Sequence, residues 1–234
     1  MFYPYYFDPT YILLIPAILL ALYAQTKVQS TYSKYLRVPS KRGMTGAEAA
    51  RELLYKNQIY DVKVEPIDGR LSDHYDPRTK TLRLSRDVYS SSSLAALGIA
   101  AHETGHAIQH AYEYAPLRLR NVIVPVANIG SSLAFPLLLL GLVLGLPNLA
   151  LIGVLAFSLA VLFQLITLPV EFNASRRAIE ALETGGIIYP DEVRPTRKVL
   201  SAAALTYVAA TIMAVMQLMR LLLLSGLLGG RRRD

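Results

Sequence analysis

Long apolar runs, separated by two polar stretches, dominate the chain. The four runs cover about residues 11–24, 121–146, 149–170 and 199–230, and about 20 apolar residues allow a helix to cross the hydrocarbon core of a bilayer. A Pro-Asn pair between the second and third runs marks a short turn, which predicts a transmembrane hairpin. The pattern therefore predicts a mainly α integral membrane protein with about four transmembrane helices.

The two outer runs differ from the hairpin. The first lacks the positively charged start and the small-residue cleavage site of a signal peptide, so a retained helix is favoured over a cleaved segment. The last run is about 45 Å long at about 1.5 Å per residue, more than one crossing requires. Arg220 within it is expected to mark the far membrane interface by extending its guanidinium towards the headgroups. The arginines at 231–233 would then lie outside, contrary to the positive-inside rule.

The first polar stretch, residues 25–120, predicts a small α+β region. Thr45 and Glu48 have the spacing of a capping box, and good helix formers follow them. Alternating apolar and polar positions at 62–65 and 82–84, with Asp-Gly and Asp-Pro turns between them, predict two or three short strands. Such a narrow sheet would not fold alone, so it should pack on helices.

A longer helix is predicted after the strands. Four serines at 90–93 offer N-caps for a helix from Leu94 to about Tyr114, which Pro116 is expected to end. The predicted parts are an N-terminal transmembrane helix (1–25), a cytoplasmic-side α+β region that carries the long helix (26–120), a transmembrane hairpin (121–170), a helix and loop (171–198) and a C-terminal transmembrane segment (199–234).

Composition and charge narrow the possible functions. Apolar residues make up 53% and charged residues 18% of the chain, against about 45–50% and about 25% in soluble proteins, which argues against a soluble enzyme. The net charge is +7, but no DNA- or RNA-binding motif accompanies it, so no nucleic-acid partner is expected. Twenty of the 24 Lys and Arg residues lie in the two polar stretches. This distribution favours a cytoplasmic location for both stretches and contact with the lipid bilayer.

The chain contains no cysteine, so any bound metal must use His, Asp or Glu. Residues 102–106 read His-Glu-Thr-Gly-His, which is an H-E-x-x-H motif. Because positions i and i+4 share one helix face, His102 and His106 can bind one zinc ion, and Glu103 can take a proton from water that the zinc activates. A chance pair of histidines on a partly buried helix is the less favoured alternative.

A catalytic zinc needs a third protein ligand and an open position. His110 continues the helical stripe but lies about 12 Å along the axis from His102. That is too far for three ligands on one straight helix, so we interpret His110 as a supporting or structural residue. Glu171 lies on the same predicted side of the membrane as the motif. By position alone, it is equally well explained as a carboxylate that a helix N-terminus favours beside the membrane.

Four segments carry a resemblance to a known family. They are residues 73–77 (DHYDP), 82–85 (LRLS), 100–109 (AAHETGHAIQ) and 169–178 (PVEFNASRRA). Together they are similar to the bacterial YugP-type neutral zinc metallopeptidases, which are membrane-embedded, and the resemblance covers almost the whole chain. The E-x-x-A-S-R sequence in the last segment also resembles the E-x-x-A-D-R of the membrane gluzincins that include the heat-shock membrane protease and the prenyl-protein protease.

The resemblance implies a complete zinc site. In the wider group the Glu of this motif is the third zinc ligand, so the likeness implies one Zn²⁺ per chain on His102, His106 and Glu171, with Glu103 as the general base. The Asp that orients a zinc-bound imidazole in the wider group is matched here by Ser175. An uncharged hydroxyl should support the basicity of the ligand less well than a carboxylate does.

Other residues near these motifs are further candidates for support or substrate binding. Asn173, Arg176 and Arg177 follow the candidate glutamate, and a basic residue there could stabilise the oxyanion of a tetrahedral intermediate. Arginines beside a membrane are, however, more often interface anchors. His74 and Tyr75 lie on a predicted strand that, at a sheet edge, could pair with an extended substrate. An ordinary hairpin is equally compatible with that pattern.

These features predict a membrane-bound zinc metalloendopeptidase with its active site facing the cytoplasm, and the resemblance implies a bacterial cell membrane. Its substrates would be membrane or membrane-proximal polypeptides. A non-catalytic scaffold or regulator with a structural metal site is one alternative. An intramembrane-cleaving zinc protease is another, although charged residues around the motif disfavour burial in hydrocarbon. Nothing in the sequence indicates an oligomeric state.

Overall fold

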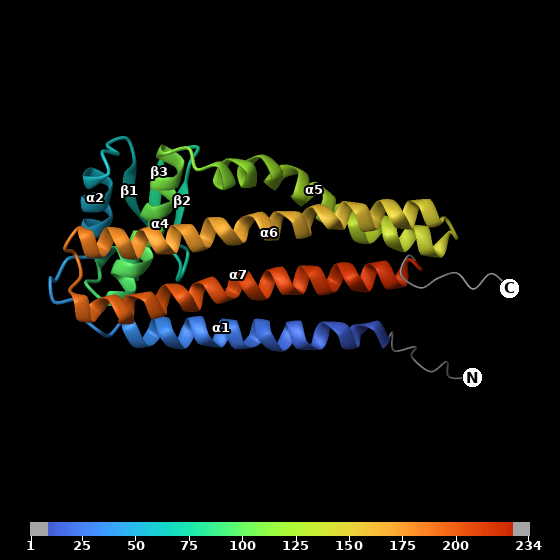
Figure 1. Ribbon diagram of the computed structural model, residues 1–234, viewed down its shortest axis with the longest axis horizontal. Helices are drawn as coiled ribbons and strands as arrows, with labels where there is room; N and C mark the ends of the chain where they lie inside the picture. The colour runs from blue at the N-terminus through green and yellow to red at the C-terminus, as the bar shows by residue number, and fades with distance from the viewer. Residues whose placement is uncertain (1–8, 227–234) are drawn as a thin grey trace. The chain divides into compact units, whose positions relative to one another are not determined.

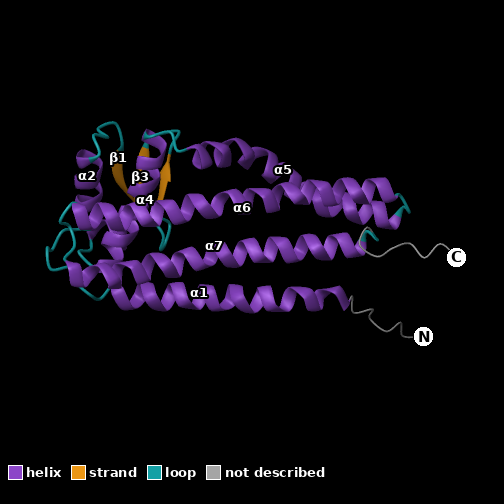
Figure 2. Cartoon of the chain, viewed as in Figure 1, coloured by secondary structure: helices purple, strands orange, loops and turns teal. Residues whose placement is uncertain are grey.

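The computed structural model describes residues 9–226, which form long helices and one small sheet (Figures 1 and 2). Within these residues, 4 helices are long and apolar enough to cross a membrane, so the predicted fold class is confirmed. The arginines at 231–233 lie outside the described residues. In chain order the elements are a 3-10 helix Pro9–Leu14, α1 Ile15–Tyr35, α2 Gly46–Lys56, β1 Lys63–Ile67, β2 His74–Asp76, β3 Thr81–Ser85, α3 Arg86–Ser90, α4 Leu94–Ala111, α5 Ala115–Val143, α6 Pro147–Thr184 and α7 Pro190–Leu224.

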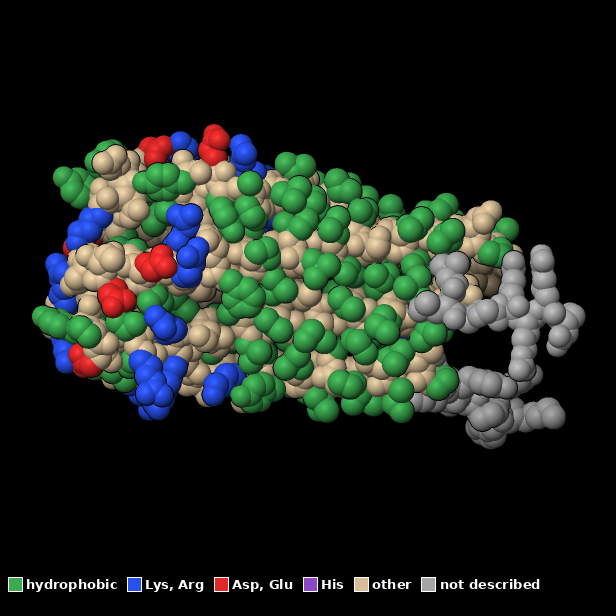
Figure 3. Space-filling model, viewed as in Figure 1, with side chains coloured by type: hydrophobic (Ala, Val, Ile, Leu, Met, Phe, Trp, Pro, Cys, Tyr) green, Lys and Arg blue, Asp and Glu red, His purple; other side chains and the backbone are tan. Residues whose placement is uncertain are grey.

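The chain divides into two compact units. The helical unit contains the described residues up to Tyr23, Arg120–Ile166 and those from Val208 onwards. The sheet-containing unit consists of Ala24–Leu119 and Thr167–Tyr207. Many hydrophobic side chains are exposed on the helical unit, and on its visible face they are spread widely between tan patches (Figure 3). Such a surface suits contact with lipid rather than with water.

Small residues bring α5 and α6 close together inside the helical unit. A Cβ atom on Gly141 would lie 2.3 Å from the backbone nitrogen of Ala150, and one on Gly153 would lie 2.7 Å from the carbonyl oxygen of Ala134. Side chains of any size at these glycines would push the two backbones apart. The close approach is typical of helix pairs in membranes. There the hydrophobic effect does not drive helices together, and small residues allow close van der Waals packing instead.

Arg220 is buried within the helical unit rather than extended freely from α7. Its Nε donates a hydrogen bond to the Thr10 hydroxyl at 3.1 Å, and its guanidinium carbon lies 3.8 Å from the centre of the Tyr11 ring. A cation in apolar surroundings is stabilised when an acceptor and an aromatic face surround it. Arg220 thus links α7 to the 3-10 helix at the start of the described chain.

The sheet has the order β1-β3-β2, with β3 in the centre. β1 pairs with β3 in parallel, whereas β2 pairs with β3 in the antiparallel direction and places Tyr75 opposite Leu82. Leu82 and Leu84 of β3 are fully buried, together with apolar residues of α2, α3 and α4. The sheet therefore packs on helices, as its narrow width predicts, and β2 forms an edge.

Two helices begin at the predicted caps. Thr45 and Glu48 form both hydrogen bonds of the capping box at the start of α2. The Ser93 hydroxyl accepts a hydrogen bond from the backbone N–H of Ala96 at 3.2 Å, which caps α4. Since α4 carries the H-E-x-x-H residues, this cap fixes where the motif lies along the helix.

Two predicted boundaries are corrected by the structure. α4 ends at Ala111, and Pro116 lies in the first turn of α5 instead of ending α4. Proline is tolerated there because the first N–H groups of a helix have no acceptor within that helix. α6 is continuous over Pro147–Thr184. The second crossing of the predicted hairpin and the helix expected after residue 171 are therefore one element.

Candidate metal centre

The candidate site is formed by α4 and by the part of α6 that belongs to the sheet-containing unit. α4 is largely buried and rich in alanine and glycine. At Gly105 a Cβ atom would lie 2.8 Å from the carbonyl oxygen of Ala174 on α6. The absence of a side chain at Gly105 thus lets the two backbones approach closely enough for side chains of both helices to meet.

A Gly105→Ala substitution is expected to disturb this crossing. The new methyl group would contact backbone, which cannot rotate away, so α4 and α6 must separate. Overpacking of this kind typically costs about 1–3 kcal/mol, and zinc affinity should fall because the proposed ligands come from both helices. Thermal unfolding and a zinc titration of the purified variant measure the two effects. Unchanged stability together with unchanged zinc affinity would show that the close approach does not position the site.

His102, His106 and Glu171 converge at the crossing. One potential ligand atom from each lies within 4.8 Å of the others. The same Glu171 oxygen, Oε2, lies 3.2 Å from His102 Nε2 and 3.5 Å from His106 Nε2. Glu171 is only 2% exposed, so its carboxylate is held among protein groups. Two imidazoles and a carboxylate form a donor set that suits zinc.

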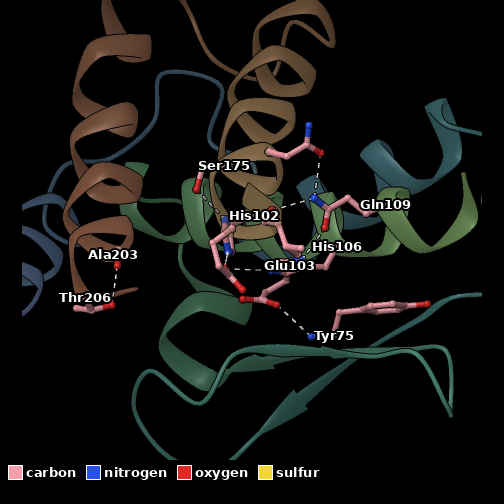
Figure 4. A network of polar contacts seen from close by, with 11 residues as sticks. Tyr75, His102, Glu103, His106, Gln109, Ser175, Ala203 and Thr206 are labelled. Atoms are coloured by element: carbon pink, nitrogen blue, oxygen red, sulfur yellow. Dashed lines mark hydrogen bonds and ion pairs between the residues drawn. The ribbon is translucent and has the colours of Figure 1, made fainter. Parts of the chain in front are cut away.

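The second ring nitrogen of each histidine has a hydrogen-bond partner (Figure 4). The Ser175 hydroxyl lies 3.1 Å from His102 Nδ1, and Gln109 Oε1 lies 3.0 Å from His106 Nδ1. Both Nε2 atoms are thereby left facing the Glu171 carboxylate. Bonds of this type fix the orientation of a metal-binding imidazole and raise its basicity.

Gln109 is a supporting residue to which the sequence analysis gave no role. It is fully buried, and its Nε2 donates to the Val170 carbonyl at 2.9 Å and to Asn173 Oδ1 at 3.0 Å. Since the amide nitrogen is committed to these two acceptors, Oε1 faces His106 and can only accept. A neutral His106 therefore carries its proton on Nδ1 and leaves Nε2 available for a metal. The only sequence signal was that Gln109 lies three positions after His106 on one helix face.

The electrostatic environment of His106 favours a cation. Burial by itself lowers the pKa of His106, but the hydrogen bond to Glu171 and the charge of Glu103 outweigh this effect and raise the pKa above its ordinary value. Nearby carboxylates stabilise positive charge on a buried group. The same negative surroundings would stabilise a bound metal ion.

Glu103 lies beside the cluster and lines a cavity of about 190 Å³ together with His102. Its Oε2 accepts a hydrogen bond from the backbone N–H of Tyr75 at 3.0 Å (Figure 4). The N–H of Tyr75 therefore points away from β3 and towards the site. Other walls of the cavity come from α1 and α7, including Val28, Val199 and Ala203. The edge strand and an apolar cavity thus meet at Glu103.

Asp73 is a further residue at this cavity. Its carboxylate accepts hydrogen bonds from the Ser85 backbone N–H at 2.8 Å and from the Ser85 hydroxyl at 3.0 Å. Burial raises the pKa of Asp73, although the hydrogen bonds from Ser85 act in the opposite direction. The contact ties the segment before β2 to the end of β3, which holds the edge strand beside the cavity.

Two other histidines singled out by the sequence lie outside the cluster. His110 Nδ1 is 2.8 Å from the Tyr75 hydroxyl. Burial raises the pKa of Tyr75 to about 12, so the phenol keeps its proton and shares a hydrogen bond with His110. His74 Nδ1 lies 2.8 Å from the Ser72 carbonyl. Among the described residues, neither His110 nor His74 belongs to the group that could hold a metal.

Asn173, Arg176 and Arg177, which follow Glu171 on α6, have different environments. Asn173 Oδ1 accepts hydrogen bonds from Gln109 and from Arg177 Nε, the latter at 2.8 Å. Arg176 is exposed and forms an ion pair with Glu180 at 3.8 Å. Arg177 therefore holds the Asn173 side chain, which in turn holds the amide group of Gln109. That either arginine stabilises an oxyanion stays a prediction.

Comparison with known proteins identifies the family to which the chain belongs. The family model described as "putative neutral zinc metallopeptidase" matches residues 10–226, and the chain belongs to this family. "Putative membrane protease YugP" of Bacillus subtilis (strain 168) is 49% identical over 212 residues, which are 91% of this chain and 94% of that protein. No solved structure matches the chain. The resemblance to the YugP-type neutral zinc metallopeptidases that the sequence motifs indicated is confirmed.

Proposed function

We propose that the protein is a membrane-bound zinc metalloendopeptidase that hydrolyses peptide bonds in membrane or membrane-proximal proteins. The observation that carries the proposal is the convergence of His102, His106 and Glu171, whose potential ligand atoms lie within 4.8 Å of one another. Glu103 lies at the adjoining cavity. Membership of a zinc metallopeptidase family supports the same conclusion.

The donor set fits a catalytic zinc ion. His102, His106 and Glu171 would hold one ion per chain and leave a position for water, the arrangement typical of catalytic rather than structural zinc. Zinc supplies a Lewis acid that lowers the pKa of water to about 7 and polarises a carbonyl group. Ser175 and Gln109 hold the two imidazoles in the orientation that directs Nε2 to the ion.

Glu103 acts as the general base in this proposal. Its carboxylate takes a proton from the attacking water and passes it to the nitrogen of the leaving amine, so the new C–O bond forms and the peptide C–N bond breaks without free charge on either product. The Tyr75 N–H holds Oε2 of Glu103 at 3.0 Å. The other oxygen, Oε1, is then available for the proton.

The edge strand β2 and the cavity define how a polypeptide would bind. An extended substrate could add to β2 as a further strand, because backbone hydrogen bonds at a sheet edge recognise peptides of varied sequence. The apolar walls from α1 and α7 favour a hydrophobic side chain next to the cleaved bond. The distribution of basic residues supports a site that faces the cytoplasm of a bacterial cell membrane.

Removal and return of the metal test this function. Purified protein loaded with one zinc per chain should cleave an unfolded membrane protein or a casein-like substrate. Treatment with a chelator should abolish cleavage, and added zinc should restore it. A structural metal site predicts instead that the zinc-free protein loses stability and that no zinc loading produces cleavage.

Gln109→Leu is expected to weaken zinc binding about 10- to 100-fold, the usual effect of losing an outer partner of a metal-binding histidine. Gln109→Glu should restore part of the affinity, because its carboxylate can still accept from His106 although it cannot donate to the Val170 carbonyl. Competition titrations with a chelating dye measure the affinity. Gln29→Leu, at an exposed glutamine on α1, is the matched control. Equal affinities for all four proteins would contradict a positioning role for Gln109.

A further inference from the structure

A basic groove of about 450 Å³ lies between α1 and α7 within the sheet-containing unit. α1 contributes Lys27, Thr31 and Lys34, which share one helix face because they are four and three positions apart. α7 contributes Lys198, with Ser201 one turn further along the same face. In Figure 3, Lys and Arg side chains gather over these parts of the two helices. The groove therefore combines three ammonium groups with hydroxyl donors.

These three lysines differ from three of the four other lysines on the same unit, the exception being Lys63. None of the ammonium groups of Lys27, Lys34 and Lys198 has a carboxylate within ion-pair distance in the part of the chain that the structure describes. Other lysines do form ion pairs, namely Lys41 with Asp191, Lys56 with Glu52 and Lys80 with Asp61. No acidic residue lines the groove. Lys34 Nζ lies 5.5 Å from the centre of the Tyr35 ring, but no carboxylate of the described residues balances the positive charge in the groove.

The groove also lies where the chain passes from polar to apolar residues. Lys27 follows the first apolar run, which ends near residue 24, by about 4.5 Å along the helix axis. Lys198 immediately precedes the last apolar run. Ala202 and Leu205 add apolar lining on α7. A ligand that fits must therefore offer an anion beside an apolar portion, at the level of the membrane interface.

We propose that this groove binds the headgroup phosphate of an anionic phospholipid. The lysines and the hydroxyl groups of Thr31 and Ser201 would contact the phosphate oxygens, and the acyl chains would leave along Leu205 towards the bilayer. An inorganic phosphate shares the anionic group but would leave the apolar lining uncovered. A bound lipid would fix the depth at which α1 and α7 enter the membrane. This binding does not depend on peptide hydrolysis.

Native mass spectrometry of the full-length, zinc-loaded protein in a nonionic detergent tests the proposal. Dioctanoyl phosphatidylglycerol should bind in a first, tight step, whereas dioctanoyl phosphatidylcholine and inorganic phosphate should bind much more weakly. Each basic residue near a membrane surface contributes about a five-fold gain in affinity. The Lys34→Gln/Lys198→Gln variant should thus bind phosphatidylglycerol roughly 30-fold more weakly, and Lys27→Gln alone about five-fold more weakly.

The control variant is Lys63→Gln/Arg78→Gln, which removes the same charge from exposed residues that do not line the groove. It should bind phosphatidylglycerol as the unmodified protein does. Equal loss in the control and groove variants would show general charge attraction and overturn the site. Equal binding of the zwitterionic lipid would also overturn it. Inorganic phosphate bound as tightly as phosphatidylglycerol would exclude the lipid, and unchanged affinity in Lys34→Gln/Lys198→Gln would exclude the groove.

Discussion

Replacing Glu103 by glutamine is expected to lower kcat for peptide hydrolysis by about 10²- to 10⁴-fold, the usual contribution of a positioned general base. Glutamine has nearly the same shape, and its amide oxygen can still accept from the Tyr75 N–H. It cannot take a proton from water. The zinc content should stay unchanged because Glu103 is not among the three proposed ligands.

The measurement is the initial rate of cleavage at matched zinc content, determined for each preparation by elemental analysis. Glu65→Gln, at an exposed position on β1, makes the same chemical change away from the cavity and should keep full activity. If Glu103→Gln and the unmodified protein cleave at the same rate with equal zinc, Glu103 is not the base. A variant that loses zinc as well as activity would instead place Glu103 among the groups that hold the ion.

Replacing Glu171 by alanine is expected to lower zinc affinity by more than about 100-fold, since loss of an outer partner alone costs about 10- to 100-fold. The carboxylate is buried, and both imidazole Nε2 atoms face its Oε2. Without it, zinc would have two protein ligands instead of three. Hydrolysis should be lost together with the metal.

Glu171→Gln distinguishes loss of a ligand from loss of packing, because glutamine fills nearly the same volume. Zinc titrations and circular dichroism of Glu171→Gln and Glu171→Ala measure metal binding and folding separately. Glu183→Gln, an exposed site on the same helix, is the control. Full zinc binding by a folded Glu171→Gln protein would rule out Glu171 as a ligand.

The features that the sequence predicted well depend on short-range spacing. Apolar runs long enough for a membrane, the capping box at Thr45 and Glu48, and the i, i+4 pair His102 and His106 each lie within one element. A helix or strand period therefore determines which side chains share a face. Pro116 shows the limit of such local signals. Proline disfavours the interior of a helix but is compatible with either side of a helix boundary.

The features that the sequence left open depend on contacts between distant segments. His102 and Glu171 are separated by 69 positions, and position alone did not distinguish Glu171 as a ligand from Glu171 as a carboxylate near a helix end. The continuity of α6 and the small residue at Gly105 bring them together. Gln109 illustrates the same limit, since its partners Val170 and Asn173 are 61 and 64 positions away. The role of a buried glutamine cannot be recognised in the sequence, because its two hydrogen-bond acceptors come close to it only in the folded protein.

His102, His106 and Glu171 are proposed to hold one zinc ion with room for water. X-ray absorption at the zinc edge of the purified, zinc-loaded protein measures which groups surround that ion. We expect two imidazole nitrogens at about 2.0–2.1 Å, recognised by scattering from the outer atoms of their rings, and oxygen ligands at about 2.0–2.2 Å. A spectrum of the unmodified protein with fewer than two imidazoles would show that His102 and His106 do not both bind the zinc ion.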